Sequence, residues 1–450
     1  MSNLLLKNAS FVALMDDAGT EITNCSIYCE NGIIKEVGKE INLPKKIDRT
    51  LNLQGMIVIP GLINTHHHLF QNLTRVYPNA QNHTLFNWLK SLYPIWKNLS
   101  PEHVISAVTL GLSELALSGC TTSSDHQYIF PGGSSLDDCI FAAEKTGLRF
   151  HATRGSMSIG ESRGGLPPDE LTEKEDDILN DCERVINKYN NPEKFSMLRI
   201  ALAPCSPFSV SQDLMKETAL LARNKNVGLH THLAENIEDI EYSEQHFGMR
   251  PGDYAESLGW VGKDVWHAHC VQLNKTEIKL FSKSCTGISH CPSSNMRLGS
   301  GIAPIRLMID EGVNIGIGVD GSSSNDSAHM LNEVRQTMLL QRVKNGPETM
   351  TAREALRLAT RGGAEVLNRT DIGQISPGFA ADFAIFDINV IDFAGALSDP
   401  ISSLVFCGPV KTTYTIVNGE IIVDKGNFVK IDLIKAIENH NNLSKKLLNI

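Results

Sequence analysis

Four short segments, far apart along the chain, carry side chains that could hold a catalytic metal ion. They are residues 64–68, 229–235, 266–270 and 318–321. Each ends a short apolar run, which is the pattern of a strand buried in a parallel sheet. A catalytic metal needs three or four nitrogen or oxygen ligands and one open position. Parallel strands that end at the same edge of a sheet could supply these ligands.

The first segment, Asn-Thr-His-His-His, follows the apolar run 58–63. Side chains alternate along a strand, so we expect His66 and His68 to point to one side and His67 to the other. A few polar residues at a strand–loop junction would be the ordinary interpretation of this segment alone. Its partners elsewhere in the chain favour a pair of metal ligands.

The second segment offers His232 at a strand end and Glu235 three residues later. After the strand stops, the chain can turn and bring Glu235 over the metal, where a carboxylate can carry protons between water and substrate. His230 shares the parity of His232, and we place it behind the ligands. In the third segment, His269 is either a metal ligand or a catalytic imidazole, while His267 is expected to be a packed core residue.

The fourth segment contains Asp320, directly after the apolar run 313–319. A charged residue that closes such a run is costly to bury unless it is paired or bound to a metal. Asp320 could bind the metal and also take a proton from the attacking water. The alternative is an aspartate that caps the next helix.

The predicted site holds one metal ion per subunit. The fourth candidate strand, 198–205, contains no lysine, so the modified lysine that bridges some two-metal barrels has no obvious source. Imidazoles with one carboxylate suit Zn²⁺, and Fe²⁺ is the second candidate. The other zinc deaminase signature, H-x-E with P-C-x-x-C, is missing from the sequence.

Four further residues are candidates for substrate binding, each with an ordinary alternative. Gln71 lies just past the first strand and could meet ring amide groups as both donor and acceptor. Trp88 could stack on a planar base or be an ordinary buried tryptophan. Cys205 and Arg154 stand at the ends of the fourth and third candidate strands, where packing and a salt bridge are the respective alternatives.

The elements that must position these side chains alternate along residues 60–372. Short apolar runs end near His68, Asp125, Arg154, Cys205, His232, His269, His290 and Asp320. Helical patterns lie between them, for example at 101–117, 171–188, 214–224 and 333–343. Eight strand–helix units in about 300 residues predict an α/β fold, a distorted (β/α)₈ TIM barrel whose C-terminal strand ends carry the chemistry.

The two ends of the chain, 1–59 and 373–450, have the patterns of β structure, with a strand at 382–387 and a helix at 432–450. Asn31-Gly32 and Asn418-Gly419 each separate two strand-like runs, which is a strong hairpin signal. Neither end is large enough to bury a core alone. We therefore expect both ends to combine into one small β-sandwich domain beside the barrel.

The composition argues against several classes of function. The chain has 450 residues, a net charge of −10 and no run of lysine or arginine, so we expect no nucleic-acid or membrane partner. Its ten cysteines are scattered without a C-x-x-C pair, which fits a reduced, cytoplasmic protein. The N-terminal apolar run, Leu4 to Leu6, is too short for a signal peptide or a membrane span.

These motifs resemble those of the amidohydrolase superfamily, over essentially the whole chain. Residues 60–68 are similar to its strand-1 motif, and residues 232–235 to the H-x-x-E of the branch that deaminates purines, pyrimidines and S-adenosylhomocysteine. The resemblance implies a barrel with a β-sandwich, a small heterocyclic substrate and a homo-oligomer. It also implies proton transfers by His269 and Glu235. The implied metal ligands are His66, His68, His232 and Asp320.

The loops expected above the barrel resemble those of superfamily members that deaminate 8-oxoguanine. The similar stretches are residues 67–75, 85–94, 155–158, 162–168 and 320–326. Loops set specificity, so this similarity implies a zinc-dependent deaminase that converts 8-oxoguanine to urate and ammonia. The alternatives are an aminohydrolase of isocytosine, guanine or a hydroxytriazine, a binuclear amide hydrolase, and a non-catalytic scaffold on the same fold.

Overall fold

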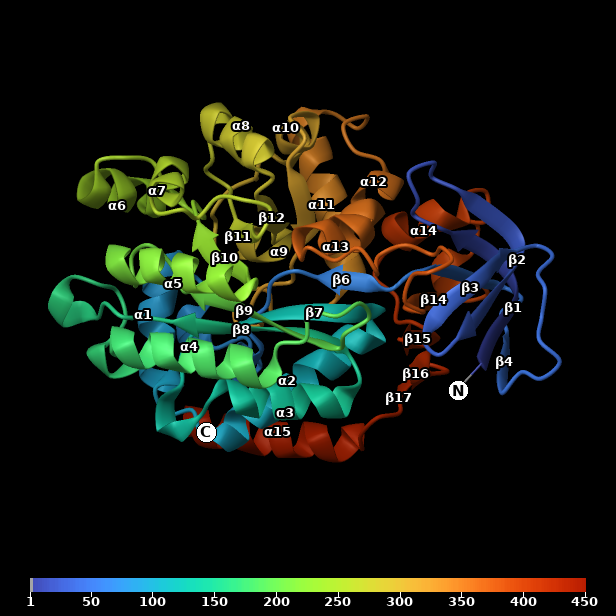
Figure 1. The fold of residues 1–450 in the computed structure, drawn as a ribbon, viewed down its shortest axis with the longest axis horizontal. Coiled ribbons are helices and arrows are strands. Elements are labelled where there is room, and N and C mark those ends of the chain that lie inside the picture. Colours follow the sequence, from blue (N-terminus) through green and yellow to red (C-terminus); the bar gives the residue numbers. More distant parts are fainter. Residues whose placement is uncertain (1–2) are drawn as a thin grey trace.

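The computed structural model describes residues 3–450, and its largest unit is a closed barrel of parallel strands (Figure 1). The strands follow one another around the barrel in chain order, and the last pairs with the first. They are β6 (Leu62–Asn64), β7 (Cys120–Gln127), β8 (Arg149–Ser156), β9 (Leu198–Pro204), β10 (Gly228–Leu233), β11 (Val265–His269), β12 (Gly287–His290) and β13 (Asn314–Ile317). The predicted (β/α)₈ barrel is confirmed.

Helices surround the barrel, and the main hydrophobic core fills the space between them and the strands (Figure 1). β10 shows how a strand serves both sides, because Leu229 and Leu233 lie in this core while His230 and His232 alternate with them. Full burial of one leucine stabilises the fold by roughly 1.5–3 kcal/mol. The barrel helices are α1 (Leu85–Trp96), α2 (Pro101–Leu117), α3 (Leu136–Thr146), α4 (Glu175–Tyr189), α5 (Gln212–Lys225), α6 (Ile237–Phe247), α7 (Pro251–Ser257), α8 (Lys275–Ser284), α9 (Pro292–Arg297), α10 (Ile305–Asp310), α11 (Met330–Asn345), α12 (Ala352–Arg357) and α13 (Gly363–Val366).

Both ends of the chain form a second sheet at one side of the barrel, on the right in Figure 1. The N-terminal strands are β1 (Asn3–Ala13), β2 (Glu21–Glu30), β3 (Ile33–Gly38), β4 (Arg49–Asn52) and β5 (Met56–Pro60). The C-terminal strands are β14 (Phe383–Asp387), β15 (Tyr414–Val417), β16 (Glu420–Asp424) and β17 (Asn427–Phe428). The two groups join where β5 pairs antiparallel with β14, so the expected combination of the ends is confirmed.

Both predicted two-residue hairpin turns are present in this sheet. Asn31 (φ 53°) and Gly32 (φ 75°) link β2 to β3, and Asn418 (φ 50°) and Gly419 (φ 79°) link β15 to β16. Asparagine and glycine adopt the positive φ that such turns require at both positions. The turns also touch each other, because a Cβ at Gly32 would lie 2.5 Å from the Asn418 carbonyl oxygen.

The limits of two barrel strands differ from the prediction. β6 ends at Asn64 rather than near His68, and β13 ends at Ile317 rather than near Asp320. Beyond these ends single hydrogen bonds replace the regular ladder, for example from Asp320 N–H to the His66 carbonyl oxygen (3.0 Å). The expectation that His66 and His68 lie on the strand is therefore wrong, because their segment leaves the sheet and crosses the barrel mouth.

Helix limits follow the sequence more closely. α2 covers 101–117 as predicted, and α15 (Leu433–Leu448) lies within 432–450. The predicted start of α4 at 171 is wrong, because Thr172 is extended after a short 3₁₀ turn and the helix begins at Glu175. Among residues 3–450, no helix has the length and apolar character that a membrane crossing requires. The domain limits at 59 and 372 stay a prediction.

Candidate metal centre and active site

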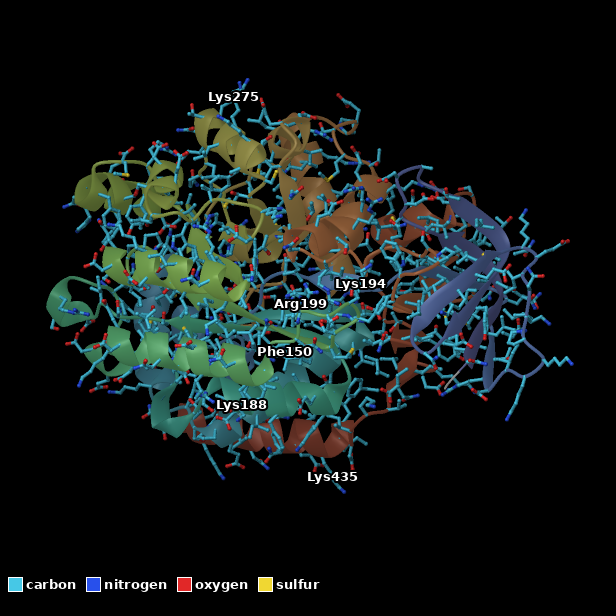
Figure 2. All side chains as sticks on the ribbon, in the orientation of Figure 1. Phe150, Lys188, Lys194, Arg199, Lys275 and Lys435 are labelled. Carbon is cyan, nitrogen blue, oxygen red and sulfur yellow. The ribbon has the colours of Figure 1, made fainter. Side chains whose placement is uncertain are left out.

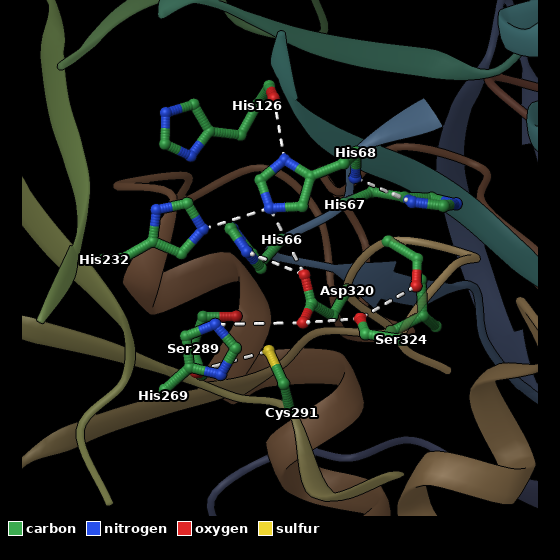
Figure 3. Close-up of polar contacts among 12 residues, drawn as sticks. His66, His67, His68, His126, His232, His269, Ser289, Cys291, Asp320 and Ser324 are labelled. Atoms are coloured by element: carbon green, nitrogen blue, oxygen red, sulfur yellow. Dashed lines mark hydrogen bonds and ion pairs between the residues drawn. The ribbon is translucent and has the colours of Figure 1, made fainter. Parts of the chain in front are cut away.

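Three imidazole rings and one carboxylate meet at the mouth of the barrel (Figure 3). His66 and His68 follow β6, His232 lies on β10 and Asp320 follows β13. The Nε2 atoms of His68 and His232 are 3.0 Å apart. Asp320 Oδ1 lies 3.2 Å from His66 Nε2 and 3.3 Å from His68 Nε2. The structure thus brings together the four side chains that the sequence singles out as ligands.

Hydrogen bonds to carbonyl groups fix which ring nitrogen carries the proton in two of these histidines. A carbonyl oxygen can only accept, so His68 Nδ1–H donates to the His126 carbonyl oxygen over 2.8 Å. His232 Nδ1–H donates in the same way to the Cys205 carbonyl oxygen over 2.6 Å. In the neutral rings both Nε2 atoms then carry lone pairs. Two facing lone pairs at 3.0 Å repel each other unless a cation shares them.

In His66, too, Nδ1 carries the proton and Nε2 the lone pair, because a second buried ring, that of His230, fixes the proton position. His230 Nδ1–H donates to the Trp266 carbonyl oxygen (2.8 Å), so neutral His230 offers its Nε2 as an acceptor. His66 Nδ1–H donates to that atom over 2.7 Å. His66 Nε2 therefore carries a lone pair, and it has no hydrogen-bond partner among the described residues.

Burial keeps these rings neutral. Desolvation lowers the pKa of His66 well below its ordinary value and lowers the pKa of His232 to about 3, with the neighbouring His68 adding to the second shift. Burial alone would raise the pKa of Asp320, but contacts with His66 and His269 hold it well below its ordinary value. Unprotonated imidazoles beside an ionised carboxylate fit a divalent cation.

His269 and Glu235 lie beside this cluster. His269 Nε2 is 3.5 Å from Glu235 Oε2 and 3.8 Å from Asp320 Oδ2, so the ring stands between two carboxyl groups. Glu235 Oε1 is buried and finds no hydrogen-bond partner in residues 3–450. Burial, together with the charges of Asp320 and Asp239, raises the pKa of Glu235 well above its ordinary value. The protonated form of this carboxyl is therefore favoured relative to that of an exposed glutamate.

The chain turns sharply at the strand ends to aim these side chains. Ala234 (φ 50°), His269 (φ 70°), Cys270 (φ 52°) and Asp320 (φ 61°) all adopt the left-handed conformation. For residues with a Cβ such conformations cost of the order of 1–3 kcal/mol, and they gather at functional sites. The turn at Ala234 directs Glu235 back toward His269.

Three residues that the sequence did not single out support the cluster. The ring of His126 stacks on that of His232 at 4.8 Å. Asn295 Oδ1 accepts a hydrogen bond from His269 Nδ1–H (2.9 Å), and Ser324 Oγ–H donates to Asp320 Oδ2 (3.2 Å). Ser324 lies in the stretch 320–326, whereas His126 and Asn295 belong to no local motif. In the sequence, the only feature that could have suggested a role for His126 in the site is its position at the end of a predicted strand.

A pocket lies directly above these groups. Its apolar wall is formed by Leu85, Trp88, Leu89, Tyr93, Phe208 and Leu298, and its polar floor by His68, Gln71, His232, Glu235, His269, Asp320 and Ser324. The free volume is about 30 Å³, which is room for a water-sized group.

Three of the four predicted substrate-binding residues line this pocket. Gln71 lies on the 3₁₀ helix Leu69–Thr74, and its buried Oε1 has no partner within the described chain. Trp88 lies on α1, and its Nε1–H donates to the Ser323 carbonyl oxygen over 3.0 Å, which leaves the ring available for contact. Burial raises the pKa of the Cys205 thiol to about 12, so this group stays protonated.

Arg154, the fourth, does not line this pocket. Its buried guanidinium is paired with Glu173 (2.7 Å) and Asp181 (2.6 Å) and lies over the ring of Phe130. The structure thus gives Arg154 the contacts of the salt-bridge alternative, because two carboxylates hold its guanidinium away from the pocket.

Comparisons with known proteins agree with this geometry. A profile of the Amidohydrolase family matches residues 57–422. The chain is 45% identical to 8-oxoguanine deaminase of Pseudomonas aeruginosa, over 87% of this chain and 88% of that protein. It is 36% identical to hydroxydechloroatrazine ethylaminohydrolase of Pseudomonas sp. (strain ADP), over 93% and 90% of the two chains.

A solved structure extends the likeness to three dimensions. Atrazine chlorohydrolase from Arthrobacter aurescens TC1, complexed with zinc, superposes with a TM-score of 0.94 at 35% identity, covering 98% of this chain and 100% of that one. The chain belongs to the amidohydrolase family, and it is an enzyme, a hydrolase of carbon–nitrogen bonds.

Proposed function

We propose that this member of the amidohydrolase family is a zinc-dependent deaminase that converts 8-oxoguanine to urate and ammonia. The observation that carries the proposal is the convergence of the His66, His68 and His232 rings and the Asp320 carboxylate beside the buried Glu235 carboxyl group. The first set can hold a metal, and the second group can deliver a proton. Hydrolytic release of an amine from a heterocycle requires both.

The metal would be held by His66, His68, His232 and Asp320. When bound, zinc supplies a Lewis acid that makes water a nucleophile near neutral pH. The single carboxylate and the absence of lysine on β9 support one ion per subunit. Imidazole and carboxylate ligands also suit Fe²⁺, which is the second candidate.

The chain's own residues move the protons. Asp320, ionised and 3.8 Å from His269 Nε2, accepts a proton from the attacking water, and His269 can share it. Glu235 holds a proton and donates it to the ring nitrogen next to the amine-bearing carbon. Water adds to that carbon, a proton reaches the amino group, and ammonia leaves while the ring regains a carbonyl. The atoms balance with water as the only co-reactant.

The pocket supports a planar heterocycle with amide-like edges. Gln71 Oε1 is an unused buried acceptor within the described residues, so it can meet a ring N–H. Trp88 and Tyr128 line the same space and offer aromatic surfaces. The choice of 8-oxoguanine is supported by the 45% identity to an 8-oxoguanine deaminase. A hydroxytriazine is the second candidate, because an ethylaminohydrolase of that class is 36% identical.

The test is ammonia release by the zinc-loaded protein on 8-oxoguanine, isocytosine, guanine and hydroxyatrazine, run side by side. We expect turnover of 8-oxoguanine, with urate in the ultraviolet spectrum. Activity on another compound alone would keep the proton chemistry and refute the substrate. If the zinc-loaded protein released no ammonia from any of the four compounds, the result would contradict the deaminase proposal itself.

A further inference from the structure

A second cavity opens at the opposite end of the barrel, where the strands begin. It is lined by residues at the starts of β9, β10 and β11, among them Arg199, Gly228 and Trp266. Its volume is about 500 Å³, within the range of small-molecule sites. The candidate active site lies at the other strand ends, so this basal cavity is separate from it.

The basal cavity concentrates positive charge on a chain whose net charge is −10. Arg199, Arg223 and Lys263 line it together with a single carboxylate, that of Asp264. Asp264 pairs with Arg223 (3.2 Å), and neither Arg199 nor Lys263 has an ion pair within residues 3–450. The cavity thus carries two cationic groups without an ion-pair partner among the described residues.

Arg199 is the central feature of this site. Its guanidinium donates to the carbonyl oxygens of Pro192 (3.1 Å) and Asn368 (3.4 Å), which fix its position without neutralising it. Burial and the nearby charges of Arg369 and Arg149 lower its pKa to about 10, which still leaves the group charged. A half-buried, fixed guanidinium beside other cations is the arrangement that binds a phosphate group bidentately.

Neutral groups in the cavity add hydrogen-bonding capacity. Asn190, which lines the cavity, accepts a bond from Ile200 N–H at its Oδ1 (3.0 Å), and its amide nitrogen keeps two donors. Burial, with Arg369 and Arg199 nearby, lowers the pKa of His151 well below its ordinary value, so this ring adds no charge.

We propose that the basal cavity is a binding site for a small phosphate-bearing anion, held by Arg199 and Lys263 next to Arg223. The Arg223 guanidinium is already bonded to Asp264 and to the Gly259 and Val261 carbonyl oxygens. The volume admits a ligand the size of a phosphate monoester, and the lone carboxylate is already paired. The site is independent of the deaminase reaction, because none of these three residues lines the pocket at the barrel mouth.

The test is calorimetric titration of the zinc-loaded protein with inorganic phosphate and with pyrophosphate, at an ionic strength held constant with sodium chloride. We expect one saturable site per chain and binding at least about tenfold weaker in Arg199→Gln, since a hydrogen bond to a charged group is worth that factor or more. Lys435→Gln is the matched control, because Figure 2 places Lys435 at the edge of the molecule, away from Arg199.

Two further measurements keep the proposal open to refutation. If Arg199→Gln does not fold, Lys263→Gln at the exposed rim should show the same direction of change. Phosphate should also alter the fluorescence of Trp266, which lines the cavity, and the change should vanish in Trp266→Phe. The absence of saturable binding by either anion, or equal binding by wild type and both variants, would overturn the proposal. Deaminase activity without phosphate should be unchanged in Lys263→Gln.

Discussion

The two ends of the barrel bury ionisable groups in opposite ways. Below the strands, Arg149 donates to both oxygens of Asp382 (3.1 Å each) and to the Phe195 and Ser196 carbonyl oxygens. Arg369 forms the same two-pronged pair with Asp371 over 2.8 Å. At the mouth, His66 Nε2 and Glu235 Oε1 are buried without a hydrogen bond from any described residue.

This difference separates structural from functional burial. A buried group with a full set of partners holds elements in place, as Asp382 does where the second sheet meets β8. A buried group without partners is costly to the fold, and a bound metal ion or substrate would satisfy those that lie at the mouth. The mouth of the barrel collects groups of the second kind, and this supports the metal centre independently of any motif.

The largest effect is expected for Glu235→Gln at the mouth. The variant keeps the size of the side chain but cannot cycle a proton, so turnover should fall by about 10²–10⁴-fold while zinc stays bound. Steady-state ammonia release and metal content of the same sample measure this. Glu241→Gln is the control, because Glu241 is exposed on helix α6, which begins two residues after Glu235. Full activity in the zinc-loaded Glu235→Gln variant would remove Glu235 from the mechanism.

The opposite pattern is expected for Asp382→Asn at the base. Removing one partner of a buried pair should lower the free energy of unfolding by about 3–5 kcal/mol, with activity per folded molecule unchanged. Urea unfolding gives the first value and turnover the second. Asp17→Asn is the control, because its pair with Arg361 is exposed and should be worth at most about 1 kcal/mol. Equal losses in the two variants would contradict this comparison.

Glu333 tests what separates the structural from the functional buried groups. The difference could lie in their hydrogen-bond partners or in their place at the base or the mouth of the barrel. It lies near the mouth but accepts hydrogen bonds from Ser293 N–H (3.1 Å) and Asn325 Nδ2 (3.0 Å), like the groups at the base. Burial raises its pKa from 4.5 to about 7, despite those bonds. The folded state therefore holds the proton more tightly than the unfolded state.

This shift gives the pH dependence a definite sign. The stabilisation is fully present below about pH 4.5 and is lost as the pH rises to about 7, by up to about 3 kcal/mol. We expect the stability advantage of the wild type over Glu333→Gln to shrink across this range, measured by urea unfolding of both proteins. The buried histidines, whose lowered pKa values make stability rise with pH, contribute equally to the two and cancel in the difference. Exposed Glu144→Gln should keep the wild-type slope. A difference in stability between the two proteins that stays constant across this range would refute the assignment.

The smallest effect is expected for the ring behind the ligands. His230→Phe preserves the stack on Trp266 (4.7 Å) but removes the acceptor of His66 Nδ1–H, so zinc affinity should fall by about 10–100-fold. Competition with a chelator measures this. His267→Phe is the matched control, because its ring bonds to the Trp260 carbonyl oxygen (2.9 Å), outside the cluster. A larger loss of affinity in the control than in His230→Phe would contradict this role of His230.

The sequence predicted the parts that follow from chain periodicity. Apolar runs that end in His or Asp predicted the barrel and the ligand segments, and Asn-Gly pairs predicted both hairpins. The structure also places His269 and Glu235 beside the four candidate ligands. The barrel and the hairpins follow from the local pattern of apolar and turn residues. The convergence of the site residues follows from the rule that neighbouring parallel strands end at the same edge of a sheet.

The rest depends on contacts between distant segments. His126 and Asn295 reach the cluster because the barrel closes, and no short motif records that. The sequence also could not predict the residue at which β6 ends. An extended segment with the same residues can either pair in the sheet or cross the mouth of the barrel. For Arg154 the strand-end position suggested substrate binding. The sequence did not reveal that its guanidinium would form ion pairs with Glu173 and Asp181 instead.

The most direct test of the metal centre is titration of the metal-free protein with Zn²⁺, with ammonia release from 8-oxoguanine measured at each step. Imidazoles that are already unprotonated and convergent should bind one equivalent tightly at pH 7, with activity rising in proportion and levelling at one zinc per chain. Full activity in the metal-free protein would contradict the account, and so would activity that levels only at two equivalents.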